Sequence, residues 1–310
     1  MKVLVTGANG FVGRAVVKRL LAAGDSVIAA VGPGASGGPA DANLAHVSLD
    51  VTNDMSVRAC FSAPVDAVIH LAAIALSRAA DRDPAMAWRV NAEGTAKLTI
   101  ALAESAAQWQ TQPIFLLAST ADVYAWQQRP IKEEDCVQPS TVYATSKLGA
   151  ELATRQIERG RGLKVLLARP FPHSGAGQDE SFWIPARCRL LRLVKNNGGV
   201  AVPVGELSAV RDFLHVDDVA DAYALLLERG TPGEVYNIAS GRPVTLDEIH
   251  TRLEQLLEIA PKREVDSSQV RREARPYLVG DATKLRAATG WTPRRTLDDI
   301  LRDVLDAQKN

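Results

Sequence analysis

Short apolar stretches alternate with longer amphipathic stretches over the first 168 residues of the chain. The apolar stretches are continuous, which is typical of strands that are buried on both faces of a parallel sheet. Their alternation with helical stretches predicts an α/β fold, in which right-handed crossovers join neighbouring parallel strands. The predicted strands cover residues 2–6, 26–31, 45–49, 65–70, 113–118 and 163–168, and the predicted helices cover residues 11–23, 54–62, 84–108 and 141–159.

The alternation breaks down after Pro170. Residues 170–177 contain prolines and glycines that predict an irregular segment. We expect the second half to form mainly a smaller lobe over the carboxyl ends of the sheet, with some segments interleaved into the first half. Residues 32–43 are crowded with Gly, Pro and Ala and predict a loop. The later predicted helices cover residues 185–196, 217–229, 246–258 and 296–307.

The composition and charge of the chain argue against several classes of function. Lys plus Arg and Asp plus Glu are equal at 36 each among 310 residues, so no overall field attracts nucleic acid or an anionic membrane. The three cysteines fit no pairing motif, which suits a reducing cytosol. No leader precedes the first strand, and no apolar run approaches the roughly 18 residues of a membrane span. We therefore expect a cytoplasmic protein, and the lack of a His/Cys cluster predicts no metal.

A glycine-rich turn follows the first predicted strand directly. Gly7, Gly10 and Gly13 have the spacing G-x-x-G-x-x-G and lead into an amphipathic helix. Glycines allow a tight strand-to-helix turn and let a pyrophosphate approach the backbone and the positive end of the helix. The turn predicts a dinucleotide site, and the alternative is a glycine turn without a ligand.

Tyr143 and Lys147 form a second candidate constellation. Residues four apart on a helix lie on the same face, one turn apart. A free tyrosine has a pKa of about 10, and a nearby ammonium favours the phenolate and lowers that pKa. The pair is a candidate proton donor; the alternative is a packed tyrosine beside a solvated lysine.

Together with further motifs, these residues resemble the extended short-chain dehydrogenase/reductase family of nucleotide-sugar epimerases, dehydratases and ketoreductases. The resemblance covers nearly the whole chain and implies a doubly wound parallel sheet of the Rossmann type. It also implies that residues 1–169 bind a dinucleotide and that residues 170–310 form mainly the substrate-binding lobe. The matching segments, in order, are Leu49–Val51, His70–Ala73, Asn91–Thr95, Ala118–Tyr124, Arg169–Phe171, Arg211–Val219, Tyr236–Gly241, Arg275–Pro276 and Gly290–Pro293.

The resemblance assigns cofactor contacts to residues from the strand ends. Among them, Asp50 is expected to bind the adenine amine and Lys147 the nicotinamide ribose. His70, at a strand end, is expected to be packed rather than catalytic. The complete implied set is Gly7, Asn9, Gly10, Phe11, Val12, Gly13, Asp50, Val51, Leu71, Ala72, Ala73, Asn91, Tyr143, Lys147 and Pro170.

The resemblance also implies a catalytic trio. The hydroxyl four residues before Tyr124 belongs to Thr120, which would bond the substrate oxygen while Tyr143 exchanges a proton with it. Ser119 is the alternative hydroxyl, and a local backbone bond is the alternative role of Thr120. Dehydratases of the family carry an acid and a base at the next two positions. Ala121 and the short Asp122 therefore disfavour dehydration.

The second half is most similar to the GDP-4-keto-6-deoxy-D-mannose reductases. This implies that Arg211 and Arg275 bind a pyrophosphate, because guanidinium groups suit phosphate oxygens; surface salt bridges are the alternative. Pro172 departs from the pattern, since the family often has Asn there. The implied substrate contacts are Thr120, Tyr143, His173, Gln178, Phe182, Arg211 and Arg275.

The end of the second predicted strand bears on cofactor choice. Residues 28–32 contain no carboxylate of the kind that holds an NAD ribose hydroxyl. Arg14 could reach a 2′-phosphate from the first helix, so we expect NADPH with tolerance of NADH.

The function expected from these motifs is reduction of the C4 keto group of a nucleotide-linked sugar. The alternatives are a UDP-hexose 4-epimerase that retains NAD and a non-catalytic dinucleotide sensor. The Ala- and Leu-rich helices 84–108 and 141–159 suggest a homodimer, by resemblance, or burial within one subunit.

Overall fold

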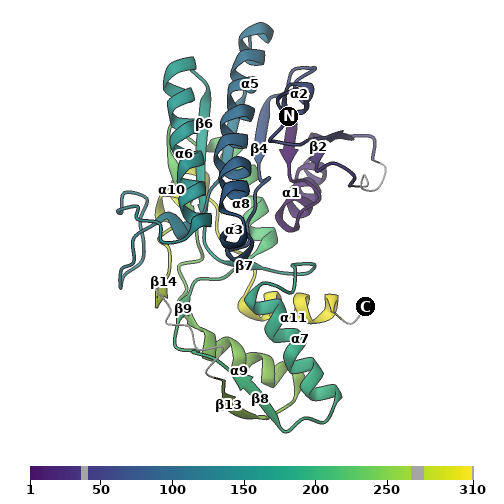
Figure 1. Ribbon diagram of the computed structural model, residues 1–310, viewed down its shortest axis with the longest axis vertical. Coiled ribbons are helices and arrows are strands. Elements are labelled where there is room, and N and C mark those ends of the chain that lie inside the picture. Colours follow the sequence, from purple (N-terminus) through teal and green to yellow (C-terminus); the bar gives the residue numbers. More distant parts are fainter. Residues whose placement is uncertain (36–40, 267–275, 309–310) are drawn as a thin grey trace.

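A seven-stranded parallel sheet forms the larger part of the protein (Figure 1). The computed structural model describes residues 1–35, 41–266 and 276–308. The strand order is β11-β6-β5-β4-β1-β2-β3, so the direction of winding reverses between β1 and β4, where ligands of such sheets bind. The predicted α/β class is confirmed. The strands are β1 (Lys2–Thr6), β2 (Ser26–Val31), β3 (Leu44–Ser48), β4 (Ala67–His70), β5 (Ile114–Ala118), β6 (Lys164–Pro170) and β11 (Val235–Ile238).

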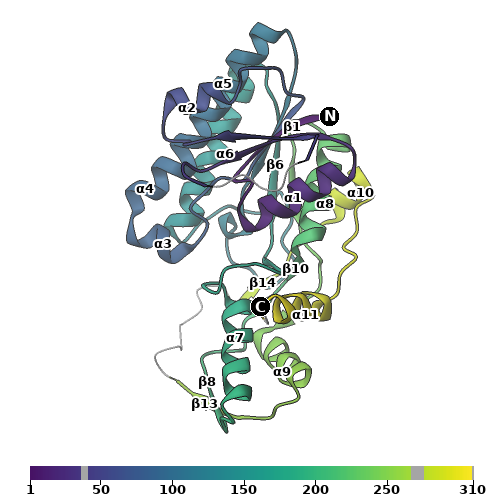
Figure 2. The same ribbon diagram turned by 90° about the vertical axis from the view of Figure 1, so that its right-hand side faces the viewer.

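Helices cover both faces of the sheet (Figure 2). Successive strand side chains point to opposite faces, so Val3 and Val5 pack in one core and Leu4 in the other. The core of Val3 and Val5 includes α1 (Phe11–Ala22), α8 (Val216–Arg229) and α10 (Thr283–Thr289). The core of Leu4 includes α2 (Asp54–Ala59), α5 (Gly94–Trp109) and α6 (Val142–Arg161).

The smaller lobe lies beyond the carboxyl ends of the strands (Figure 1). It has its own apolar core, which includes Ile184, Leu191, Val202, Ile249 and Leu301. β6 ends at the lobe and leads into β7, so the chain crosses there from sheet to lobe. The lobe and the junction contain β7 (His173–Ser174), α7 (Trp183–Asn196), β8 (Ala201–Val204), β9 (Val210–Arg211), β10 (Leu214–His215), β12 (Val244–Thr245), α9 (Leu246–Leu257), β13 (Lys262–Val265), β14 (Tyr277–Leu278) and α11 (Leu297–Ala307).

The structure differs from the predicted elements in two places. The predicted helix 84–108 is divided into α4 (Pro84–Trp88), a π-helical turn η1 (Arg89–Glu93) and α5, and α3 (Ser77–Arg82) precedes it. Asp83 separates α3 from α4 because its side chain accepts the Met86 N–H and caps the new helix, with Pro84 at the first position. The second difference is β11, which completes the large sheet beside β6 although it follows the lobe helix α7 in sequence. The four residues of β11 are too few to show the hydrophobic periodicity from which a strand is predicted.

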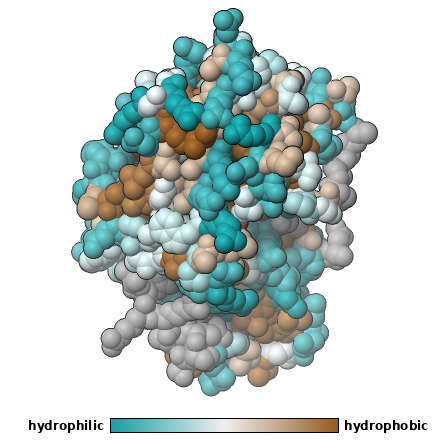
Figure 3. Space-filling model, turned by 45° about the horizontal axis from the view of Figure 1, so that its top comes forward, coloured by the Kyte–Doolittle hydropathy of each residue, from teal (hydrophilic) through white to brown (hydrophobic). Residues whose placement is uncertain are grey.

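The surface carries few large apolar side chains. Figure 3 shows a largely hydrophilic face in which hydrophobic residues form separate patches. Leu152 on α6 is 64% exposed and Trp88 on α4 is 43% exposed. Within the described residues, we find no helix that combines the length and apolarity needed to cross a membrane.

Candidate active site

The glycine turn between β1 and α1 accepts only glycine at two positions. Gly7 has φ +64°, a left-handed conformation, and a Cβ there would lie 3.0 Å from the backbone nitrogen of Ala72. A Cβ at Gly13 would lie 2.1 Å from the Gly7 carbonyl oxygen. Gly10 caps α1 without a side chain, so the first backbone N–H groups of this 12-residue helix face the turn. The cradle therefore fits an anionic pyrophosphate.

A buried hydrogen-bond network supports the turn from behind. The Thr6 hydroxyl accepts the N–H groups of Leu71 and Ala72 at 3.1 Å and lies 2.7 Å from Nδ1 of His70. The other ring nitrogen of His70 lies 3.0 Å from the Thr95 hydroxyl. Burial, with a smaller contribution from Lys147, lowers the pKa of His70 to about 3. His70 is therefore neutral and structural, in agreement with the sequence-based expectation.

Asn91 lies in the π-helical turn and is completely buried. Its side-chain oxygen accepts the Ile74 N–H at 2.8 Å, and its amide nitrogen donates to Ile74 O and to the Ser146 hydroxyl. Ser146 in turn donates to the Tyr143 carbonyl at 2.8 Å. Asn91 thus anchors α6 against the segment after β4. Its amide is used within the protein, and its contact with a cofactor stays a prediction.

α6 carries the tyrosine and lysine of the candidate site. The Tyr143 hydroxyl lies near the Thr120 side chain, whose hydroxyl accepts the Asp122 N–H at 3.1 Å. The Ser119 hydroxyl instead donates to the buried carboxylate of Glu151. The structure therefore brings Thr120 to Tyr143 and turns Ser119 away, a distinction that adjacent residues in a sequence do not reveal.

The pKa values of the pair are shifted by burial. Burial and the nearby Asp122 carboxylate raise the pKa of the Tyr143 phenol, and the Thr120 hydrogen bond only partly opposes them. This direction is opposite to the lowering expected from Lys147, because desolvation of the phenolate dominates. Burial also lowers the pKa of Lys147 to about 8, while Glu151 raises it.

Lys147 is the predicted cofactor residue whose charged group is best suited to bind a ligand. Its side chain is almost fully enclosed, and no hydrogen bond or ion pair links its Nζ to another residue in the described part of the chain. Buried charged groups are normally paired. An ammonium with free donors near His70, at the end of β4, fits the ribose hydroxyls of a dinucleotide.

Other predicted cofactor residues lie at the same edge of the sheet. Asp50 follows β3, and its Oδ1 accepts the N–H and hydroxyl of Thr52, which lower the pKa of the carboxyl. Val51 packs so closely on α5 that a Cβ at Gly94 would lie 2.8 Å from its side chain. Pro170 is the last residue of β6.

Arg14 has a different role from the one expected. Its guanidinium donates to the Asn9 carbonyl at 2.8 Å and to the Gly177 carbonyl at 3.0 Å. The rings of Phe11 and His173 stack next to this contact, with an interplanar angle of 4°. Arg14 therefore joins the glycine turn to the first segment of the lobe, and its carbonyl contacts occupy the group expected to reach a 2′-phosphate.

The predicted substrate residues occupy the junction between sheet and lobe. Gln178 accepts from Ser174 and donates to the His173 carbonyl, so its amide shapes its own loop. Phe182 immediately precedes α7, and Arg211 lies in β9 and donates to the Val210 carbonyl. Arg275 lies outside the described residues.

Asp212 fixes the position of the segment that carries Arg211. Its buried carboxylate accepts the N–H groups of Ser240, Gly241 and Gly280. Burial raises the pKa of Asp212 and these donors oppose the rise. The sequence motif drew attention to Arg211, whereas the neighbouring aspartate joins three distant segments.

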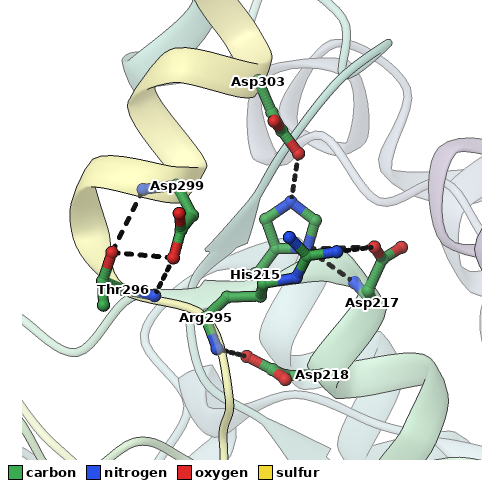
Figure 4. Close-up of polar contacts among 7 residues, drawn as sticks. All are labelled: His215, Asp217, Asp218, Arg295, Thr296, Asp299 and Asp303. Carbon is green, nitrogen blue, oxygen red and sulfur yellow. Dashed lines mark hydrogen bonds and ion pairs between the residues drawn. The ribbon is translucent and has the colours of Figure 1, made fainter.

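His215 links α8 to the C-terminal helix α11 (Figure 4). Its Nε2 lies 2.9 Å from Asp303 on α11, and its Nδ1 accepts the Asp217 N–H. Asp218 accepts the N–H groups of Arg294 and Arg295 just before that helix. His215 and Asp218 of the Arg211–Val219 motif therefore hold the lobe to the sheet.

Comparison with known proteins agrees with this geometry. The NAD dependent epimerase/dehydratase family matches residues 3–239. GDP-6-deoxy-D-mannose reductase of Pseudomonas aeruginosa is 36% identical over 77% of this chain and 79% of its own. UDP-glucose 4-epimerase of Streptococcus mutans is 28% identical over 99% of this chain and 96% of its own. The solved structure of RMD from Pseudomonas aeruginosa complexed with NADPH superposes with a TM-score of 0.86 at 32% identity, covering 100% of this chain and 99% of that one. The chain belongs to the NAD dependent epimerase/dehydratase family.

Proposed function

We propose that this protein reduces the C4 keto group of a nucleotide-linked 4-keto-6-deoxyhexose, with a GDP-sugar as the favoured substrate. The observation that carries the proposal is the Tyr143–Thr120 pair together with the buried Lys147, which has no hydrogen-bond partner among the described residues. The printed names of two relatives, a GDP-6-deoxy-D-mannose reductase and an RMD structure with NADPH, support the same chemistry.

In this mechanism Tyr143 is the proton donor. Its phenol is protonated at neutral pH, as required of a group that protonates the oxygen of a reduced carbonyl. Thr120 positions that oxygen, and Lys147 holds the ribose of the dinucleotide. The bound cofactor supplies the hydride that adds to the carbon.

Dehydration does not suit the same cleft. Elimination of water needs an acid and a base in addition to the tyrosine. Ala121 is buried and has no proton to transfer. Asp122 raises the pKa of Tyr143, so its charge serves to retain the phenolic proton.

The proposal includes NADPH as the favoured cofactor and NADH as the weaker one. β2 ends in Val31 with no carboxylate to repel a 2′-phosphate, and the related RMD structure contains NADPH. Residues 1–169, completed by α8 and β11, would bind the dinucleotide, and residues 170–310 mainly the sugar nucleotide. A homodimer through α4, α5 and α6 also stays a proposal, with Leu152 and Trp88 as exposed apolar positions.

Substitution of the two adjacent hydroxyls tests their assignment. We expect Thr120→Val to lower kcat about 100-fold, because it removes a hydrogen bond to the reacting oxygen. Ser119→Ala should lower kcat far less, since Ser119 contacts Glu151 instead. Steady-state rates of both variants decide between them, and equal losses would contradict the assignment.

The activity itself can be tested by following NADPH oxidation in the presence of GDP-4-keto-6-deoxy-D-mannose. We expect turnover with NADPH, weaker turnover with NADH, and a raised melting temperature with GDP-linked ligands, by mass action. Loss of every keto-sugar-dependent oxidation would contradict the proposal.

The second candidate is a UDP-hexose 4-epimerase, favoured by the near full-length match to the Streptococcus mutans enzyme. It predicts that the purified protein retains NAD and interconverts UDP-glucose and UDP-galactose without added reductant. Tight dinucleotide binding with no turnover of either substrate class would instead favour a sensor.

A further inference from the structure

A buried ion pair between Glu151 and Arg169 lies one helical turn from the candidate catalytic residue Lys147. Glu151 Oε1 and Oε2 accept from Nε and Nη2 of Arg169 at 3.0 and 2.6 Å. The side chains are 4% and 7% exposed. Ser119 donates a further hydrogen bond to the same carboxylate. The Arg169 guanidinium also lies 4.7 Å from the centre of the Tyr124 ring. The carboxylate is thus held in one position by three hydrogen bonds from two residues.

Stability alone does not account for this pair. Moving two charges out of water is expensive, and well-packed apolar residues often stabilise a core equally well. The location is more informative. Glu151 comes four residues after Lys147 on α6, so the two side chains share one helical face, one turn apart. The Glu151 carboxylate therefore faces two cations. It is hydrogen-bonded to the Arg169 guanidinium, whereas it acts on the Lys147 ammonium without a hydrogen bond.

The charged surroundings of Lys147 are few. Arg169, on β6, is bonded to the Glu151 carboxylate. Asp122, in η2 (Ala121–Val123), acts on Tyr143, which lies one turn before Lys147 on α6. His70 on β4 is neutral, and the nearby polar residues of η1 and α5, Asn91 and Thr95, carry no titratable group. Glu151 is the group that opposes the effect of burial on the lysine.

We propose that Glu151 is a positioning residue that keeps the Lys147 ammonium charged inside the cleft, and that Arg169 both fixes the carboxylate and limits its field. Because this role serves the lysine of the proposed oxidoreductase, it rests on that function. Neither Glu151 nor Arg169 needs to touch substrate or cofactor. The pair acts through the charge state of Lys147, which in turn must donate to the ribose.

The opposite charges of Glu151 and Arg169 make the test directional. Glu151→Gln removes the attraction and leaves Arg169 positive, so the titration midpoint of Lys147 should fall by about one to two pH units. Arg169→Met leaves the carboxylate without its partner, so the midpoint should rise. Glu151→Asp retains the charge and should keep the midpoint near that of the unmodified protein. A purely structural role would not move the midpoint in opposite directions.

The midpoint can be read without any turnover. Lysines labelled with ¹³C at Cε are followed by NMR across their titration, and Lys147→Met identifies the signal. Glu158→Gln is the matched control, because it removes the same charge from the same helix at a position paired with Arg155; it should change nothing. An unchanged Lys147 midpoint in Glu151→Gln, or shifts of the same sign in Glu151→Gln and Arg169→Met, would overturn the proposal. If Glu151→Gln does not fold, the rise in Arg169→Met decides.

Activity provides a separate readout. The high-pH limb of kcat/KM should move to lower pH in Glu151→Gln, since Lys147 then loses its proton earlier. If no keto-sugar is reduced by any of these proteins, the proposed function fails while the NMR titration still reports on Glu151. If reduction is normal but the midpoint stays fixed, the inference fails and the proposed function stands.

Discussion

Tyr143→Phe should lower kcat for keto-sugar reduction by about 100- to 10,000-fold, the range typical of a lost general acid. Phenylalanine preserves the ring, so the packing of α6 should be retained. The variant removes only the hydroxyl that lies near Thr120 and whose pKa is raised by burial. The rate of Tyr143→Phe at saturating substrate tests the loss of kcat. Its NADPH affinity, measured by calorimetry, tests whether the cofactor still binds.

Tyr236→Phe is a suitable control for the loss of a tyrosine hydroxyl. Tyr236 is buried in β11, and its oxygen accepts the Thr231 N–H at the far edge of the sheet. This variant should keep kcat close to the unmodified value. Near-normal turnover in Tyr143→Phe would refute the proton-transfer mechanism, whereas loss of NADPH binding would point to a structural defect.

Gly13→Ala should weaken dinucleotide binding by about 100-fold or more, the order of loss expected from a misplacement of about 1 Å. The added Cβ would lie 2.1 Å from the Gly7 oxygen and 2.7 Å from Ala8 Cα, both rigid backbone atoms. The turn must therefore open, which we expect to destabilise the fold by about 1–3 kcal/mol. Calorimetric titration with NADPH and thermal unfolding measure the two effects.

Gly160→Ala is the matched control for Gly13→Ala. Gly160 lies in the last turn of α6, and a Cβ there would meet nothing within 4 Å. Alanine is a better helix former than glycine, so this variant should be as stable as the unmodified protein or slightly more stable. NADPH affinity unaffected in Gly13→Ala would show that the turn does not hold the pyrophosphate.

Local patterns were sufficient to predict the strands of the first half, and they supplied the candidate site residues. Buried parallel strands require continuous apolar stretches, and all six predicted strands are found in the large sheet. The spacing of Gly7, Gly10 and Gly13 reflects steric limits within one short turn. The four-residue spacing of Tyr143 and Lys147 reflects one turn of a helix. Each of these signals depends on residues that are close in sequence, so a single chain displays it.

The tertiary structure decided which polar groups are free to react. Ser119 and Thr120 are adjacent and chemically similar, yet Glu151 engages one and Tyr143 the other. The Arg14 guanidinium donates a hydrogen bond to the carbonyl of Gly177, which is 163 residues away in the sequence. The direction of the Tyr143 pKa shift also depends on burial, which distant segments produce together. Hydrogen-bond partners and desolvation come from the packing of the whole chain, and no local pattern encodes them.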